Sequence, residues 1–294
     1  MKPARFKYLA PSTLEDALAH LSEAGNDGKL LAGGQSLVPM MNFRLVQPTV
    51  LIDLNPIREL DYLVEGEDKV RVGGMTRLSR LEGGREIRGK VPLLSEALPH
   101  IAHTQIRTRG TIGGSLAHAD PAAELPVVAI AADARVKVKN RQRERWLTAR
   151  EFFVGTFTTA LEEDEILTEV EFPQNPPRTG WAFLEFARRE GDYALAGVAV
   201  RITLAEDATL QDVRLVYLNA GDGPLEATQA AFRLTGERYS SSGIAEAARI
   251  AAETEISPLG NVHASPAYQR HLAEVLTRSA LERAYQRARD ALPL

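Results

Sequence analysis

Two short segments that join a glycine pair to a small hydroxyl residue constrain this chain more than any other feature. They are Ala32-Gly33-Gly34-Gln35-Ser36 and Thr111-Ile112-Gly113-Gly114-Ser115. Glycine lets the backbone turn sharply and approach a ligand closely, so several N–H groups can converge on one anion. Either segment alone is also compatible with a plain turn. Together they predict that both segments bind one long anionic ligand, for which a dinucleotide with a central pyrophosphate is the natural candidate.

The composition excludes several classes of function. The chain has 294 residues, enough for two domains, and a net charge of −4, which is unlike the basic surface of a nucleic-acid-binding protein. It has no cysteine, so disulfides and metal or iron–sulfur centres held by its own thiolates are excluded. The N-terminus lacks the apolar stretch of a signal peptide, and no apolar run is long enough to span a membrane. We therefore expect a cytoplasmic protein with neither nucleic acid nor a membrane as partner.

Hydrophobic spacing predicts an α+β fold of two domains. Three prolines within 173–177 mark the boundary, so we expect one domain over 1–177 and a second over 178–294. The first domain mixes strands at 29–31, 50–54, 69–73 and 134–138 with helices at 14–21, 78–81, 93–101 and 121–132. The second has antiparallel strands followed by helices, with strands at 181–187, 197–204 and 210–218 and helices at 225–234, 244–253 and 267–290.

Other motifs that carry chemistry are weak or missing. No G-x-G-x-x-G follows a strand, and the segment 84–90 has phosphate-loop spacing but is followed by Val91 where a hydroxyl residue should hold magnesium. His100 and His103 could share a helical face, but a metal site needs more ligands. Ser36 and Ser115 lack a nucleophile elbow and a histidine partner, which argues against acyl transfer.

The residues after the second glycine segment strengthen the prediction of a dinucleotide. A helix that starts near Pro121 would direct backbone N–H groups and the positive end of its dipole toward phosphates. Glu124 in its first turn could accept hydrogen bonds from ribose hydroxyls. The alternative role for Glu124 is simply to stabilise the helix dipole.

Three groups of residues resemble those of a known family. They are 32–41 followed by Asp53-Leu54-Asn55, then 105–124, and then Arg188-Arg189-Glu190-Gly191-Asp192-Tyr193-Ala194. In order and spacing they are similar to the FAD-binding medium subunits of molybdenum hydroxylases, the family of carbon monoxide dehydrogenase and xanthine dehydrogenase. The resemblance covers essentially the whole chain. It implies a PCMH-type FAD-binding domain of two subdomains, followed by a smaller domain like the C-terminal domain of CO dehydrogenase flavoproteins.

The resemblance also implies a set of FAD-binding residues and no catalytic residue. Residues 32–37 and 111–115 would hold the FAD pyrophosphate through backbone N–H groups, and Glu124 would meet the ribose. Ile101 and Ala102 would line the flavin, and Tyr193 would lie near the isoalloxazine ring. The complete set is Leu31, Ala32, Gly33, Gly34, Gln35, Ser36, Leu37, Ile101, Ala102, Thr111, Gly113, Gly114, Ser115, Glu124 and Tyr193.

Three positions depart from the family's commonest pattern. Gln35 stands where many relatives have histidine, and Ser115 often corresponds to asparagine. Both side chains still form hydrogen bonds, so FAD binding is not put in doubt. Glu185 stands where several relatives have lysine near the flavin, and it is therefore left out of the predicted site.

The implied function is electron transfer within a complex. A large molybdenum-cofactor subunit would oxidise substrate, a small [2Fe–2S] subunit would pass the electrons on, and the FAD of this chain would deliver them to an external acceptor. The subunits would form a dimer of heterotrimers. The missing cysteines fit, because the clusters would belong to a partner. A self-sufficient FAD oxidoreductase and a scaffold subunit without cofactor are the alternatives, and the substrate and acceptor stay open.

Overall fold

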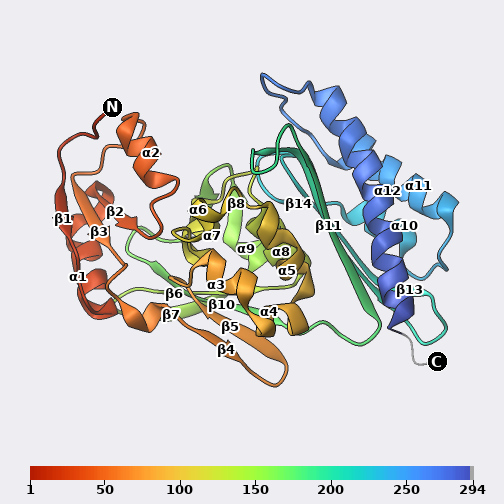
Figure 1. The fold of residues 1–294 in the computed structure, drawn as a ribbon, viewed down its shortest axis with the longest axis horizontal. Coiled ribbons are helices and arrows are strands. Elements are labelled where there is room, and N and C mark those ends of the chain that lie inside the picture. Colours follow the sequence, from red (N-terminus) through yellow and green to blue (C-terminus); the bar gives the residue numbers. More distant parts are fainter. Residues whose placement is uncertain (292–294) are drawn as a thin grey trace.

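The computed structural model describes residues 1–291, which form three blocks in a row (Figure 1). The first two blocks are built from the N-terminal part of the chain up to Pro173, and the third from the C-terminal part that begins at Thr179. The mixture of helices and sheets confirms the predicted α+β class. Within the described residues, no helix combines the length and the apolar character needed to cross a membrane.

The first block is a small parallel sheet covered by one helix. The strands lie in the order β1 (Lys7–Leu9), β3 (Val50–Asp53) and β2 (Gly28–Leu31). The helix α1 (Leu14–Ala24) begins at Thr13, whose side chain accepts the Asp16 N–H, and it buries a leucine face against Ile52. A short helix, α2 (Leu37–Asn42), follows the first glycine segment.

The second block is an antiparallel five-stranded sheet with helices packed on it. Its strands lie in the order β4 (Leu63–Glu65), β5 (Lys69–Gly73), β10 (Ile166–Pro173), β6 (Arg135–Lys139) and β7 (Glu144–Thr148). The helices are α3 (Leu78–Gly83), α4 (Arg85–Lys90), α5 (Pro92–Ala97), α6 (Thr104–Arg107), α7 (Ile112–His118), α8 (Glu124–Ala131) and α9 (Ala149–Phe152). Every residue of α8 is buried, so this helix is the centre of the block. A short hairpin of β8 (Phe153–Gly155) and β9 (Thr158–Thr159) completes it.

The third block is a four-stranded antiparallel sheet with helices on its outer face. Its strands are β11 (Thr179–Ala187), β12 (Ala194–Leu204), β13 (Leu210–Leu218) and β14 (Leu225–Glu226), in that order. The long helix α12 (Pro266–Asp290) crosses β11 and β12, and it packs so closely that a Cβ on Gly180 would collide with the backbone of Ala284. The helices α10 (Thr228–Leu234) and α11 (Ser241–Ile250) lie beside it, and α11 continues as a π-helical turn at Ala251–Glu255 (Figure 1).

The inner face of the third block packs against the second block. Phe183, Ala199 and Val216 belong to the same apolar core as the residues of α5 and α8. At the edge of this contact, Arg201 and Arg150 both bind Asp133, at 2.5 and 2.7 Å. The two halves of the chain are therefore joined by a continuous core and a charged network.

Several predicted elements differ from the structure in their bounds. The helix predicted from residue 121 begins at Glu124, because the Asp120 side chain accepts the Ala122 N–H and holds a turn there. The predicted 93–101 helix ends before Ile101 as a 3₁₀ turn at Leu98–His100. His103 lies outside that turn, so the two histidines do not share a helical face. The strand β10 was not predicted, and the helix predicted from residue 225 begins at Thr228.

Candidate functional site

The first glycine segment leaves β2 as an open turn with unpaired backbone donors. Gly34 has a φ of +73°, a conformation that favours glycine. The position of Gly33 also requires glycine, because a Cβ there would collide with the carbonyl oxygen of Arg109. Among residues 1–291, no hydrogen-bond acceptor is recorded for the backbone N–H groups of Gly33, Gly34, Gln35 and Ser36. This turn therefore offers a cluster of free donors.

The second glycine segment lies directly against the first. A Cβ on Gly114 would lie 3.2 Å from the Cβ of Ala32 and 2.8 Å from the Thr111 hydroxyl oxygen. Gly113 is packed in the same way against the backbone of Gly74. The structure thus brings together two segments that are about 80 residues apart in sequence, as a shared ligand would require.

The second segment is the first turn of a helix rather than a loop. Thr111 caps α7 and accepts the Gly114 N–H at 3.1 Å, and its carbonyl accepts the Ser115 N–H. The N–H of Gly113 donates to the Gly74 carbonyl at 2.9 Å. The backbone N–H groups of residues 112–115 are therefore already paired within the protein. Its free polar contribution to a ligand comes from the hydroxyl of Ser115, whereas the first segment supplies N–H groups.

A polar network holds the two segments in place. The Asn55 side chain donates to the Ala32 carbonyl at 2.9 Å. The Arg77 guanidinium donates both to the Asn55 side chain and to the Arg109 carbonyl, the group on which Gly33 packs. No sequence motif pointed to Arg77, although Asn55 stands at the end of the first family motif.

The predicted flavin-lining residues form a second turn, which is fixed by a buried cation. Ile101 is buried, and Ala102 has a φ of +46°. The Arg107 guanidinium, which pairs with Glu82, donates to the carbonyls of Ile101 and Ala102 at 3.0 and 3.1 Å. This buried arginine was not predicted as a site residue, and its role is to hold an unusual backbone conformation.

Glu124 lies at the buried end of the site. It is the first residue of α8 and only 8 % exposed. Burial, together with the charge of Glu185 on β11, raises the pKa of Glu124 to about 7. His100 lies 3.4 Å from Glu185, which raises the pKa of the imidazole. Tyr193, which directly precedes β12, is 70 % exposed and interacts electrostatically with Glu124.

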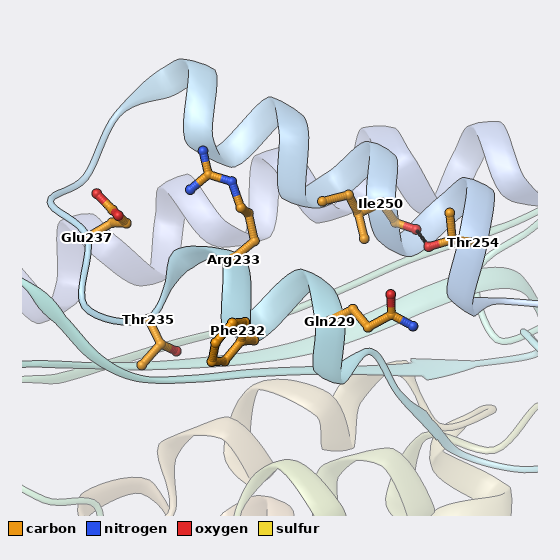
Figure 2. A pocket seen from close by; sticks show the side chains of 7 residues that line it. All are labelled: Gln229, Phe232, Arg233, Thr235, Glu237, Ile250 and Thr254. Atoms are coloured by element: carbon orange, nitrogen blue, oxygen red, sulfur yellow. Dashed lines mark hydrogen bonds between the residues drawn. The ribbon is translucent and has the colours of Figure 1, made fainter.

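A surface groove on the third block is separate from these residues. It has a volume of about 540 Å³ and lies between α10 and α11, and Figure 2 shows its lining side chains. It is lined by Gln229, Phe232, Arg233, Thr235, Glu237, Ile250 and Thr254. None of these is a predicted site residue, so the groove does not bear on the dinucleotide.

Comparison with known proteins identifies the family. A model described as the FAD binding domain in molybdopterin dehydrogenase matches residues 4–175, and the CO dehydrogenase flavoprotein C-terminal domain matches residues 181–284. The chain belongs to the FAD-binding medium subunits of molybdenum hydroxylases. It is 40 % identical to the 6-hydroxypseudooxynicotine dehydrogenase complex subunit alpha of Paenarthrobacter nicotinovorans, covering 98 % of this chain and 97 % of that one.

Two further relatives agree with this assignment. This chain is 44 % identical to the caffeine dehydrogenase subunit beta of a Pseudomonas species, and the match covers 76 % of each chain. Its structure matches that of carbon monoxide dehydrogenase from Hydrogenophaga pseudoflava with a TM-score of 0.94 at 36 % identity, covering 98 % of this chain and 99 % of that one. The predicted family, fold and FAD cofactor are confirmed.

The residues of this medium subunit fit FAD. The free N–H groups of the first segment suit a pyrophosphate, and the glycines at 33 and 114 allow the two segments to pack closely against each other and against the Arg109 carbonyl. What the sequence analysis missed is the set of side chains that position these groups. They are Asn55, Arg77 and Arg107. Glu185 was left out of the predicted site because several relatives have lysine there, and nothing in the sequence indicated that His100, 85 positions earlier, lies beside it.

Proposed function

We propose that this medium subunit holds FAD between its two glycine segments and passes electrons through it. The first segment binds the pyrophosphate through N–H groups, with Leu31 and Leu37 at its two ends. Thr111, Gly113, Gly114 and Ser115 form the opposite wall, Glu124 meets the ribose, and Ile101, Ala102 and Tyr193 surround the flavin. The bound FAD supplies the redox chemistry, and the chain orients it and controls access to it.

The observation that carries this proposal is the contact between Ala32 and Gly114 beside a row of unpaired backbone donors. A preorganised cluster of N–H groups binds a pyrophosphate without the cost of reorganising the loop. The residues of this site position a cofactor.

The partners and the location belong to the same proposal. Relatives are named as medium chains or as subunits of dehydrogenase complexes, which supports a large molybdenum-cofactor subunit and a small [2Fe–2S] subunit as partners. Because this chain has no cysteine, the iron–sulfur clusters would be held by another chain. We extend the proposal to a dimer of heterotrimers in the cytoplasm.

Purification of the tagged chain from its native organism tests the proposal. We expect FAD, iron and molybdenum to co-purify with it, together with a large and a small subunit. The chain separated from its partners should keep its flavin but not oxidise the substrate of the complex. A flavin-containing chain that purifies alone and turns over substrate would show a self-sufficient oxidoreductase. A colourless chain in an intact complex would show a scaffold.

A further inference from the structure

Three titratable side chains from different elements meet where the third block packs on the second. His100 comes from the 3₁₀ turn after α5, Glu124 begins α8, and Glu185 lies near the C-terminal end of β11. The His100 ring also packs on Phe183, with 5.3 Å between ring centroids. We refer to His100, Glu124 and Glu185 as the acid cluster.

One carboxylate oxygen of the acid cluster has no partner. The Glu185 side chain is 6 % exposed, and its Oε1 faces the His100 imidazole at 3.4 Å. Its Oε2 is fully buried and forms no hydrogen bond with any of the described residues. A buried carboxyl oxygen without a hydrogen-bond partner costs free energy.

The groups around the acid cluster are mostly acidic. Asp120 and Tyr193 face Glu124, and Glu96 on α5 faces His100. On α12, Arg283 and Arg287 pair with Glu96 at 3.4 and 2.5 Å, and Arg107 on α6 donates to the carbonyls of Pro99 and Ile101 on either side of His100. His100 is the basic group of the cluster itself; Glu185 raises the pKa of its imidazole, and its side chain is 39 % exposed.

We propose that the acid cluster takes up one proton when the FAD of this chain is reduced and releases it when the FAD is reoxidised. This inference rests on the proposed function, because it needs the flavin beside Ile101, which follows His100 in the chain. Two electrons from the iron–sulfur clusters of a partner and one proton from water go to the flavin, which gains one net negative charge. A second proton from water binds the acid cluster and cancels that charge.

Electrostatics explains why the second proton binds the acid cluster. Added negative charge favours the protonated form of a neighbouring acid. Glu124 has a pKa of about 7, so it is partly ionised near neutral pH before the electrons arrive. Reduction of the flavin would raise the pKa of Glu124 and so complete the protonation of its carboxyl. By linkage, a protonated Glu124 favours the reduced flavin to the same extent.

The pH dependence of the flavin midpoint potential measures this proton directly. With the FAD-loaded chain, each proton taken up per two electrons adds about 30 mV per pH unit to the slope. We expect a slope between pH 7 and 8 that approaches about 60 mV per unit in the wild type, for two protons, and about 30 mV per unit in Glu124→Gln, for one. Glu185→Gln should move the steep region to lower pH, because it removes the charge that raises the pKa of Glu124.

A matched control and a second variant keep the test decisive. Glu171→Gln changes a mostly buried glutamate on β10 that pairs with Lys69 away from the acid cluster, and it should keep the wild-type slope. If Glu124→Gln lowers FAD binding, Glu185→Gln carries the test. Equal slopes in the wild type and both cluster variants would overturn the inference but not the proposed function. Failure of the wild-type chain to bind FAD would overturn both.

Discussion

At the scale of single residues, Glu124 shows how packing changes the chemistry of a side chain. Its carboxyl is buried at the start of α8, near the second carboxyl of Glu185. A group whose pKa is higher in the folded than in the unfolded chain binds protons preferentially in the folded state. The contribution of Glu124 to the free energy of unfolding is therefore fully present at low pH, and it falls as the pH rises from about 4.5 toward 7.

Glu124→Gln should for this reason stabilise the FAD-free chain at alkaline pH. The cost of ionising Glu124 amounts to at most about 3 kcal/mol above pH 8, and an uncharged amide does not bear it. We expect the variant to be more stable by about 1–3 kcal/mol at pH 8.5 and within about 0.5 kcal/mol of the wild type at pH 4.5. Urea unfolding at both pH values measures this, and a variant that is less stable at pH 8.5 would refute it.

The sequence predicted where Glu124 lies but not what surrounds it. Local patterning placed it in the first turn of a helix, and it is the first residue of α8. Its neighbour Glu185 is 61 positions later in the chain and arrives through the packing of β11 against the second block. Such a contact depends on tertiary structure, which a single sequence does not reveal.

At the scale of elements, the N-terminus of α7 organises the second glycine segment. The Thr111 hydroxyl accepts the Gly114 N–H, and the adjoining Gly113 N–H is held by the Gly74 carbonyl. Glycine is a poor helix former, so two adjacent glycines favour a loop in the sequence. Here contacts with the neighbouring turn at 74–76 override that preference, and the segment begins a helix.

Thr111→Ala tests the importance of this cap. Loss of the hydroxyl leaves the Gly114 N–H without its acceptor, and we expect a loss of about 1 kcal/mol in the free energy of unfolding. Thr111→Ser keeps the acceptor and should retain most of the stability. The comparison is made by urea unfolding of both variants. Equal stabilities of Thr111→Ala and Thr111→Ser would show that the cap contributes nothing.

The other elements were predicted with mixed success. The helices α1 and α12 were expected from the spacing of their apolar residues, and the strands β11 to β13 were expected because their apolar runs are separated by polar turns. The strand β10 was missed because it is buried on both faces and flanked by β5 and β6, so its acidic residues do not alternate with exposure. Its ion pairs become visible only in three dimensions.

At the scale of the whole molecule, one charged network joins the two halves of the chain. Burial alone would raise the pKa of Asp133, but Arg201, Arg150 and Arg214 together hold it below its usual range. The stabilisation from these ion pairs is present above pH 4, and it is lost as the pH falls through the lowered pKa of Asp133. Asp133 belongs to the second block, and Arg201 lies on β12 of the third.

Asp133→Asn should weaken the contact between the halves. The Arg201 side chain is only 7 % exposed, so the change leaves part of its charge unpaired in the interior. We expect a loss of about 2–4 kcal/mol at pH 7, somewhat below the cost of breaking an isolated buried pair because Asp212 remains. Asparagine tolerates the φ of +52° at this position, which limits the effect to the charge.

Calorimetry at pH 7 and pH 3.5 checks this prediction. The difference between Asp133→Asn and the wild type should shrink at the lower pH, where Asp133 itself begins to lose its charge. A constant difference at both pH values would mean that the loss does not come from the charge. The exposed Asp207→Asn serves as the control, since its side chain lies in the turn between β12 and β13.

The claim that most depends on the structure is that FAD lies between the two glycine segments. Titration of the FAD-free chain with FAD, followed by flavin fluorescence, tests it with Gly114→Val and Gly89→Val. A side chain at 114 meets Ala32 and Thr111, whereas one at 89 on α4 meets nothing within 4 Å. We predict one FAD per chain for the wild type and for Gly89→Val, and binding at least about 100-fold weaker for a folded Gly114→Val. Equal FAD affinity in all three proteins would contradict the account.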